Sequence, residues 1–167
     1  MRIMGIDPGY GIIGFSFIDK ETKGNSVVDY GVITTPKEMD FNMRLKAIYE
    51  SMQKLIDKYS PNEVAIEKLY FNKNITTGIP VAEARGVILL SVINKDLPVY
   101  EYTPQQIKIA LTGIGKADKS QVQFMVKTLL NLTKIPRPDD AADAVAVALC
   151  HSQTSKLMIS QMERKIL

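Results

Sequence analysis

The chain has 167 residues, 46% hydrophobic and 23% charged, a net charge of +3 and one cysteine, Cys150, so the composition is that of a globular domain and excludes a disulfide-stapled fold. No apolar run approaches the roughly 20 residues of a membrane helix, and the first residues lack the apolar core and cleavage site of a signal peptide. We therefore expect one cytoplasmic domain without a membrane partner, and the mild positive charge only weakly favours nucleic acid.

The first part of the chain predicts three strands. Residues 3–7 form a short apolar run that ends in a carboxylate, residues 10–19 alternate around Phe15, Phe17 and Asp19, and residues 27–35 are predicted as the third strand. The polar stretch 20–25 between the last two is typical of a hairpin turn. Strands joined this closely pair antiparallel, so we expect a meander.

Helices and strands alternate from Asp40 onward. Apolar residues spaced three and four apart after Asp40 predict a helix with one buried stripe. Pro80 is expected near the start of the next helix, where proline is tolerated. The predicted order is a helix from Asp40, a strand at 64–67, a polar loop at 68–78, a helix to about Ile93 and a strand at 97–102.

Three more helices are predicted before a tail at 153–167. Thr103 is a plausible N-cap for the first, the second follows Asp118, and the third begins near Asp139 as its N-cap and runs to about Ser152. The tail mixes basic and apolar residues and fits a loose helix, a partner segment or disorder. Strands that alternate with helices favour parallel pairing, so the pattern predicts an α/β layer fold with an antiparallel edge, in one domain at 1–152.

Four carboxylates occupy positions where catalytic or ligand-binding residues are common. Asp7 and Glu67 each end a buried strand, and ligand sites in α/β sheets lie beyond the carboxyl ends of parallel strands. Asp140 and Asp143 are three apart and share one helix face. The structural alternatives are that Asp7 caps a turn and that the helix pair only complements the helix dipole.

If these carboxylates converge, their chemistry favours a hard cation. Oxygen ligands without histidine or cysteine are typical of Mg²⁺ or Mn²⁺ rather than Zn²⁺. Two such ions about 3.5–4 Å apart can activate water and stabilise the leaving oxygen in phosphodiester hydrolysis. The single histidine, His151, follows Cys150 near the end of a predicted helix, and we interpret both as structural.

The acidic residues belong to a series of short motifs. They are residues 5–9 (GIDPG), 65–67 (AIE), 84–86 (ARG), 113–115 with 119–121 (GIG and KSQ) and 140–144 (DAADA). In this order and spacing, over about residues 1–151, they resemble the RuvC family of Holliday-junction resolvases. The resemblance implies an RNase H-like fold whose five-stranded mixed sheet has strands 1–3 antiparallel and strands 4 and 5 parallel to strand 1.

The resemblance also implies a mechanism and partners. It implies that Asp7, Glu67, Asp140 and Asp143 bind two Mg²⁺ ions, which Mn²⁺ can replace. It further implies a homodimer that nicks opposing strands of four-way junction DNA in recombination and repair, and the RuvA–RuvB branch-migration complex as partner.

Basic and aromatic residues are the expected DNA contacts. Lys108 and Lys119 match family lysines near the scissile strand, and Lys119 is expected to stabilise charge in the transition state. Tyr70 and Phe71 follow Glu67 in the polar loop, where one of them could stack on unpaired bases or instead anchor the loop. The further candidates are Lys73, Lys116 and Arg85, and then Lys68 and Arg137.

Three other functions fit parts of the pattern. One is an RNase H-fold nuclease for RNA or RNA–DNA hybrids, against which Lys119 and the aromatic loop argue. Another is an actin-like ATPase, suggested by the turn at 7–11, although 167 residues cannot supply its two lobes. The third is a non-catalytic DNA-binding protein, which would gain nothing from four carboxylates beside a phosphate backbone.

Overall fold

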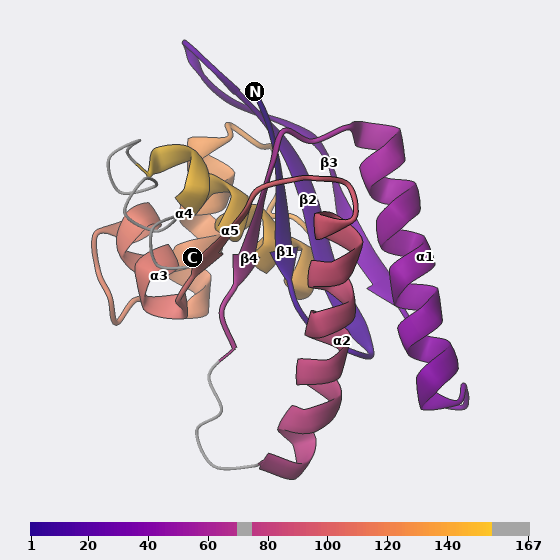
Figure 1. The fold of residues 1–167 in the computed structure, drawn as a ribbon. Coiled ribbons are helices and arrows are strands. Elements are labelled where there is room, and N and C mark those ends of the chain that lie inside the picture. The colour runs from indigo at the N-terminus through magenta and orange to yellow at the C-terminus, as the bar shows by residue number, and fades with distance from the viewer. Residues whose placement is uncertain (70–74, 155–167) are drawn as a thin grey trace.

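A five-stranded mixed sheet forms the centre of the computed structural model, which describes residues 1–69 and 75–154 (Figure 1). Its strand order is β3-β2-β1-β4-β5. Strands β1 to β3 pair antiparallel, whereas β4 is parallel to β1 and β5 is parallel to β4. The predicted sheet is therefore confirmed. The strands are β1 (Arg2–Asp7), β2 (Ile12–Glu21), β3 (Gly24–Thr34), β4 (Glu63–Glu67) and β5 (Val99–Tyr102).

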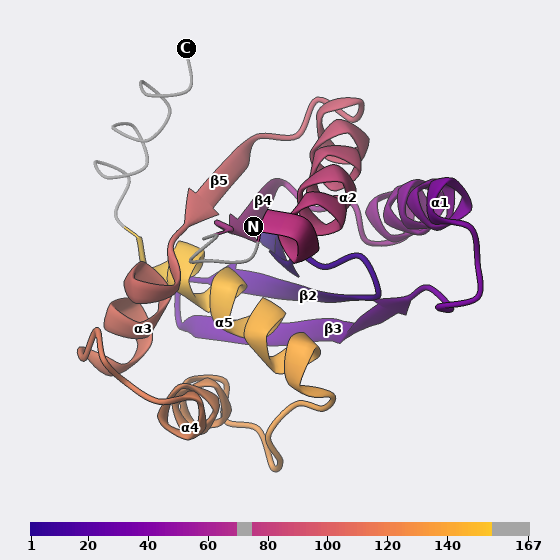
Figure 2. The same ribbon diagram turned by 90° about the horizontal axis from the view of Figure 1, so that it is seen from below.

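Within the described ranges, five helices cover the two faces of this sheet, α1 and α2 on one and α3, α4 and α5 on the other (Figure 2). None of the helices in the described ranges is long and apolar enough to cross a membrane. The helices are α1 (Phe41–Tyr59), α2 (Ile75–Ile93), α3 (Pro104–Thr112), α4 (Lys119–Leu129) and α5 (Asp139–Gln153).

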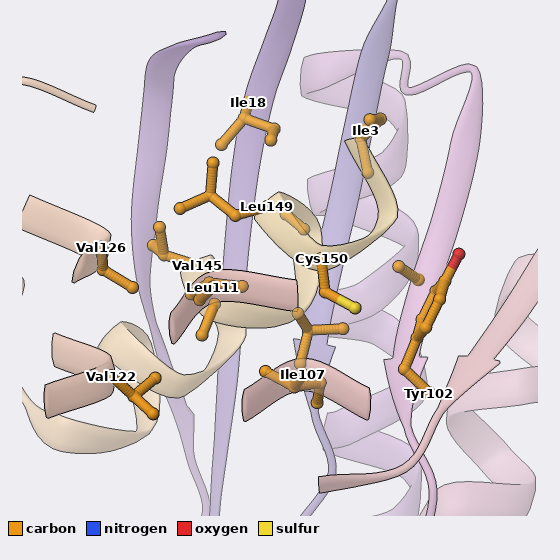
Figure 3. Packing of buried hydrophobic residues seen from close by; sticks show 14 of the residues in the cluster. Ile3, Ile18, Tyr102, Ile107, Leu111, Val122, Val126, Val145, Leu149 and Cys150 are labelled. Atoms are coloured by element: carbon orange, nitrogen blue, oxygen red, sulfur yellow. The ribbon is translucent and has the colours of Figure 1, made fainter. Parts of the chain in front are cut away.

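Side chains of β1 contribute to two separate hydrophobic cores, because successive residues of a strand point to opposite faces of the sheet. Ile3 belongs to the cluster beneath α3, α4 and α5, whereas Met4 and Ile6 belong to the cluster beneath α1 and α2. Figure 3 shows the first cluster, in which Ile107 and Leu149 fill the layer between helices and sheet. Both faces of the central strand are thus buried.

Three predicted helix starts are confirmed by the capping contacts. Asp40 caps α1 by accepting a 2.9 Å hydrogen bond from the amide of Asn42, and Thr103 and Asp118 begin α3 and α4 with full capping boxes. The hairpin between β2 and β3 is tighter than predicted, since β2 runs to Glu21 and β3 begins at Gly24, whose φ of 144° suits glycine.

Two predictions about helix starts are wrong. Helix α2 begins at Ile75, inside the predicted polar loop, so Pro80 lies within the helix. Packing of this apolar helix offsets the hydrogen bond that proline removes. Asp139 is not an N-cap: Pro138 holds that position, and no side chain makes a capping bond there. The carboxylate of Asp139 instead bonds to side chains of neighbouring segments, as described below.

Candidate active site

Glycines in β1 and β2 allow α5 to lie directly on the sheet. A Cβ atom on Gly5 would lie 2.2 Å from the carbonyl oxygen of Ala144, and one on Gly14 would lie 2.0 Å from that of Asp140. Gly14 is also the β-sheet partner of Asp7. The close contact therefore brings the first turn of α5, with Asp140 and Asp143, to the end of β1.

Asp7 and Glu67 end neighbouring parallel strands. Ile6 and Ile66 are paired across β1 and β4, and Asp7 and Glu67 are the residues that follow them. Neighbouring strands lie about 4.8 Å apart, so these two carboxyl groups lie at the same edge of the sheet. The predicted meeting of the two strand ends is confirmed.

The four carboxylates lie close enough for some of their charges to interact. Burial, followed by the negative charges of Glu67, Asp143 and Asp140, raises the pKa of Asp7 to about 8. Burial, followed by the charge of Asp143, raises the pKa of Glu67 to about 7. Carboxylates from β1, β4 and α5 thus interact electrostatically in a partly buried environment.

Two lysines supply the opposing charge. The Nζ atom of Lys119 lies 2.8 Å from Oδ2 of Asp143, and Lys119 lowers the pKa of both Asp7 and Glu67 against the larger effect of burial. Lys108 acts in the same sense on Glu67. Both lysines line a cavity of about 190 Å³ together with Glu67 and Asp143. The cavity thus combines acidic and basic groups at its wall.

The donor set fits a hard divalent cation. All four acidic groups are carboxylates, which are the preferred ligands of Mg²⁺ and Mn²⁺, and a bound cation would relieve the repulsion that adds to burial in raising the two pKa values. Within the described part of the chain, no three acidic, histidine or cysteine side chains are close enough together to enclose an ion as they stand. Side-chain rearrangement would therefore be needed to complete the coordination of an ion.

The other predicted DNA contacts divide into three groups. Lys116 is exposed in the loop between α3 and α4. Arg85 forms a close ion pair with Glu101 on β5, and its side chain is only 19% exposed, so its guanidinium is already engaged within the fold. Tyr70, Phe71 and Lys73 lie outside the described residues.

A buried arginine that the sequence analysis missed fixes the loop after Asp7. Arg44, on α1, donates from Nε to the hydroxyl of Thr35 at 2.9 Å, and its guanidinium lies 4.7 Å from the ring centroid of Tyr10. The hydroxyl of Thr35 in turn donates to the carbonyl oxygen of Tyr10 at 2.6 Å. The sequence does carry one sign that Arg44 is buried, because Arg44 lies four residues before Ile48 and so on the buried stripe of α1.

The histidine and the cysteine belong to the core, as expected. His151 is buried and bonded at both ring nitrogens, to the hydroxyl of Tyr102 at 2.6 Å and to Glu63 Oε2 at 2.7 Å. Burial lowers the pKa of His151, which favours the neutral ring. Burial likewise raises the pKa of the Cys150 thiol to about 12, which makes it unreactive.

Comparisons with known proteins give a consistent result along almost the whole chain. The family model described as "Crossover junction endodeoxyribonuclease RuvC" matches residues 3–151. A protein of Thermosipho melanesiensis with the same description is 57% identical, and the match covers 90% of this chain and 96% of the relative. One of Thermotoga maritima is 51% identical, and the match covers 93% of each chain.

Solved structures agree with the sequence relatives. The Thermus thermophilus RuvC structure superposes with a TM-score of 0.87 at 31% identity, covering 95% of this chain and 97% of that one. The same protein in complex with Holliday junction substrate gives a TM-score of 0.84 at 29% identity, covering 92% and 94% of the two chains. The fold is therefore the RNase H-like fold that the sequence motifs implied.

Proposed function

Since this chain belongs to the RuvC family of crossover junction endodeoxyribonucleases, we propose that it resolves four-way DNA junctions by metal-dependent hydrolysis at Asp7, Glu67, Asp140 and Asp143. The observation that carries the assignment is the charge coupling of carboxylates from β1, β4 and α5 beside two lysines. The T. thermophilus relative in complex with junction DNA supports the choice of substrate.

Magnesium is the proposed cofactor, with two ions per site and Mn²⁺ as a substitute. Bound there, such ions would activate a water and stabilise the leaving oxygen of the cleaved strand. The four carboxylates would hold them as oxygen ligands. Asp7 and Glu67 come from rigid strand ends, and Asp140 and Asp143 from a helix packed on those strands, so the chain itself needs little rearrangement.

The lysines act on the DNA strand in this proposal. Lys108 and Lys119 line the cavity beside Glu67, where their charges would bind the phosphate backbone and Lys119 would stabilise charge developing on the phosphate. Lys116 is exposed in the adjoining loop and is a further contact. Tyr70, Phe71 and Lys73 stay predictions for contacts near the junction centre. Arg85 is the weakest candidate because it is engaged with Glu101.

A homodimer would supply the paired cuts. An exposed apolar stripe on α2 supports it: Ile79, Leu90 and Ile93 are more than half exposed and lie on one side of the helix. Gly86 is exposed on the same side and carries no neighbour within 4 Å of an added Cβ, which would allow a second helix to approach closely. Two copies related by a two-fold axis would match the symmetry of a four-way junction.

Three further parts of the proposal, namely the protein partner, the location and the domain bounds, rest on the sequence and the family. The RuvA–RuvB branch-migration complex is the proposed protein partner, and the cytoplasm is the proposed location. Residues 1–152 are proposed to form the whole nuclease domain, with the tail at 153–167 outside it.

The decisive test is cleavage of a synthetic four-way junction labelled in turn on each strand. We expect symmetric nicks in two opposing strands with Mg²⁺ and none with a chelator. Linear duplex and RNA–DNA hybrid serve as matched substrates and should stay intact. Equal cutting of the hybrid would favour the alternative nuclease, and a single unpaired nick in each junction would argue against the dimer.

A further inference from the structure

Asp139, the first residue of α5, uses both carboxylate oxygens. Its Oδ1 atom accepts a 3.2 Å hydrogen bond from the side-chain amide of Gln123 and a close ion pair from Arg137. Its Oδ2 atom lies 3.4 Å from Nζ of Lys119, which also reaches Asp143 at 2.8 Å. One carboxylate oxygen of Asp139 is therefore bound by Gln123 and Arg137, and the other faces Lys119.

This arrangement is not explained by helix capping. Asp139 makes no capping bond, and its side chain extends toward α4 instead. Lys119 is the first residue of α4, and a positive charge at a helix N-terminus opposes the helix dipole. Lys119 therefore destabilises the helix that it begins, and Asp139 and Asp143 of α5 compensate for its charge.

Gln123 gives the acceptor a fixed position. It lies four residues after Lys119, so both side chains are on the same face of α4. Gln123 is only 7% exposed, and its amide joins α4 to the start of α5. The helix that presents the lysine thus also orients the carboxylate that the lysine contacts.

We propose that Asp139 is a positioning residue that holds the ammonium of Lys119 in the cavity while Asp143 serves as a metal ligand. The inference rests on the proposed function. The oxygen of Asp143 that contacts Lys119 cannot bind a cation and the lysine equally well, and positive charge on a cation would repel the ammonium. Asp139 lies outside the four proposed ligands, so it can keep Lys119 beside the scissile phosphate.

The test is a double-mutant cycle between Asp139→Asn and Lys119→Met in the full-length protein. Single-turnover junction cleavage should slow about tenfold in Asp139→Asn, because a misplaced group near the reacting atoms costs rate. Junction binding measured without metal should change less than about twofold, since an exposed pair contributes little affinity. Adding Asp139→Asn to Lys119→Met should have no further effect on cleavage.

Mg²⁺ binding without DNA gives a second, independent measurement. In Asp139→Asn, Lys119 has Asp143 as its remaining partner and competes with the cation, so calorimetry should show Mg²⁺ binding weakened by about threefold. The weakening should disappear when Lys119 is also replaced. Asp139→Glu keeps the charge and should restore part of the cleavage rate.

The control is Asp57→Asn, which removes a comparable exposed ion pair, to Lys95 at 2.6 Å on the far side of the molecule. It should match the wild-type protein in every assay, and thermal unfolding of all variants shows that they are folded. An equal cleavage loss from Asp139→Asn with and without Lys119 would overturn the inference. An unchanged rate in Lys119→Met alone would instead reject the role of Lys119 in the proposed function.

Discussion

The hydroxyl of Ser16 on β2 donates a buried 2.9 Å hydrogen bond to the carbonyl oxygen of Ala144 on α5. Ala144 directly follows Asp143, so this bond joins the sheet to the helix at the turn that carries the acidic pair. Together with the glycine contacts, it makes the placement of Asp140 and Asp143 a property of backbone packing. The proposed site is therefore supported by regular elements, which hold functional groups more precisely than loops do.

Gly14→Ala tests that support. The added Cβ would overlap the backbone of Asp140, which cannot rotate away, so we expect a loss of about 2–3 kcal/mol in the free energy of unfolding and slower cleavage. Urea denaturation measures the first effect. Gly31→Ala is the matched control, because there the nearest atoms belong to the ring of Phe15, which can move. A larger loss at Gly31 than at Gly14 would contradict the argument.

Asp7→Asn should separate cutting from binding. The change removes one charge from the proposed metal ligands without touching the lysines, so cleavage should fall at least about 100-fold while junction affinity stays near that of the wild-type protein. Gel-shift titration with a chelator present and a cleavage time course with Mg²⁺ provide the two measurements. Full activity in this variant would reject the assignment of Asp7.

The metal-free protein should lose stability as the pH rises. Folded Asp7 and Glu67 keep their protons up to pKa values of about 8 and 7, whereas an unfolded carboxyl group releases its proton near pH 4. Between these values the folded state binds more protons than the unfolded chain, so the free energy of unfolding decreases with pH.

Urea denaturation at several pH values between 5 and 8, with a chelator, measures this slope. Asp7→Asn should reduce it, and Mg²⁺ should stabilise the protein more at pH 8 than at pH 5, because binding displaces the protons. Stability that rises over this range would show that the pKa values of Asp7 and Glu67 are not raised in the folded protein.

Lys119→Ala should weaken cleavage more than binding. The ammonium lies beside Asp143 within the cavity, where it would contact the reacting phosphate, while the other proposed basic residues would still bind the DNA backbone. Cleavage rate at saturating enzyme and junction affinity without metal are the readouts. An equal loss in both would assign Lys119 to DNA binding alone.

Local patterns in the sequence predicted the scaffold of the site. Apolar runs ending in Asp7 and Glu67, and the i, i+3 spacing of Asp140 and Asp143, depend on short-range periodicity and are confirmed in the strands and in α5. The sheet order followed from the family motifs and from the rules for parallel connections.

Contacts between distant segments were not predictable in the same way. The sequence predicts an N-cap at Asp139 because capping is the usual role of an aspartate before a helix, whereas its partner Gln123 lies 16 residues away. The ion pair between Arg85 and Glu101 and the bond from Arg44 to Thr35 likewise join separate elements. The buried stripe of α1 indicates that Arg44 is buried, but nothing periodic indicates which residue it contacts, so the partners in such pairs become visible only once the chain is folded.

The position of α5 at the end of the described chain has a consequence for biosynthesis. Its apolar side chains complete the core on one face of the sheet, and its first turn brings Asp140 and Asp143 to Asp7 and Glu67. A nascent or prematurely terminated polypeptide that stops before residue 139 lacks both. Under the proposed assignment of Asp140 and Asp143, such a fragment could neither complete this core nor cleave DNA.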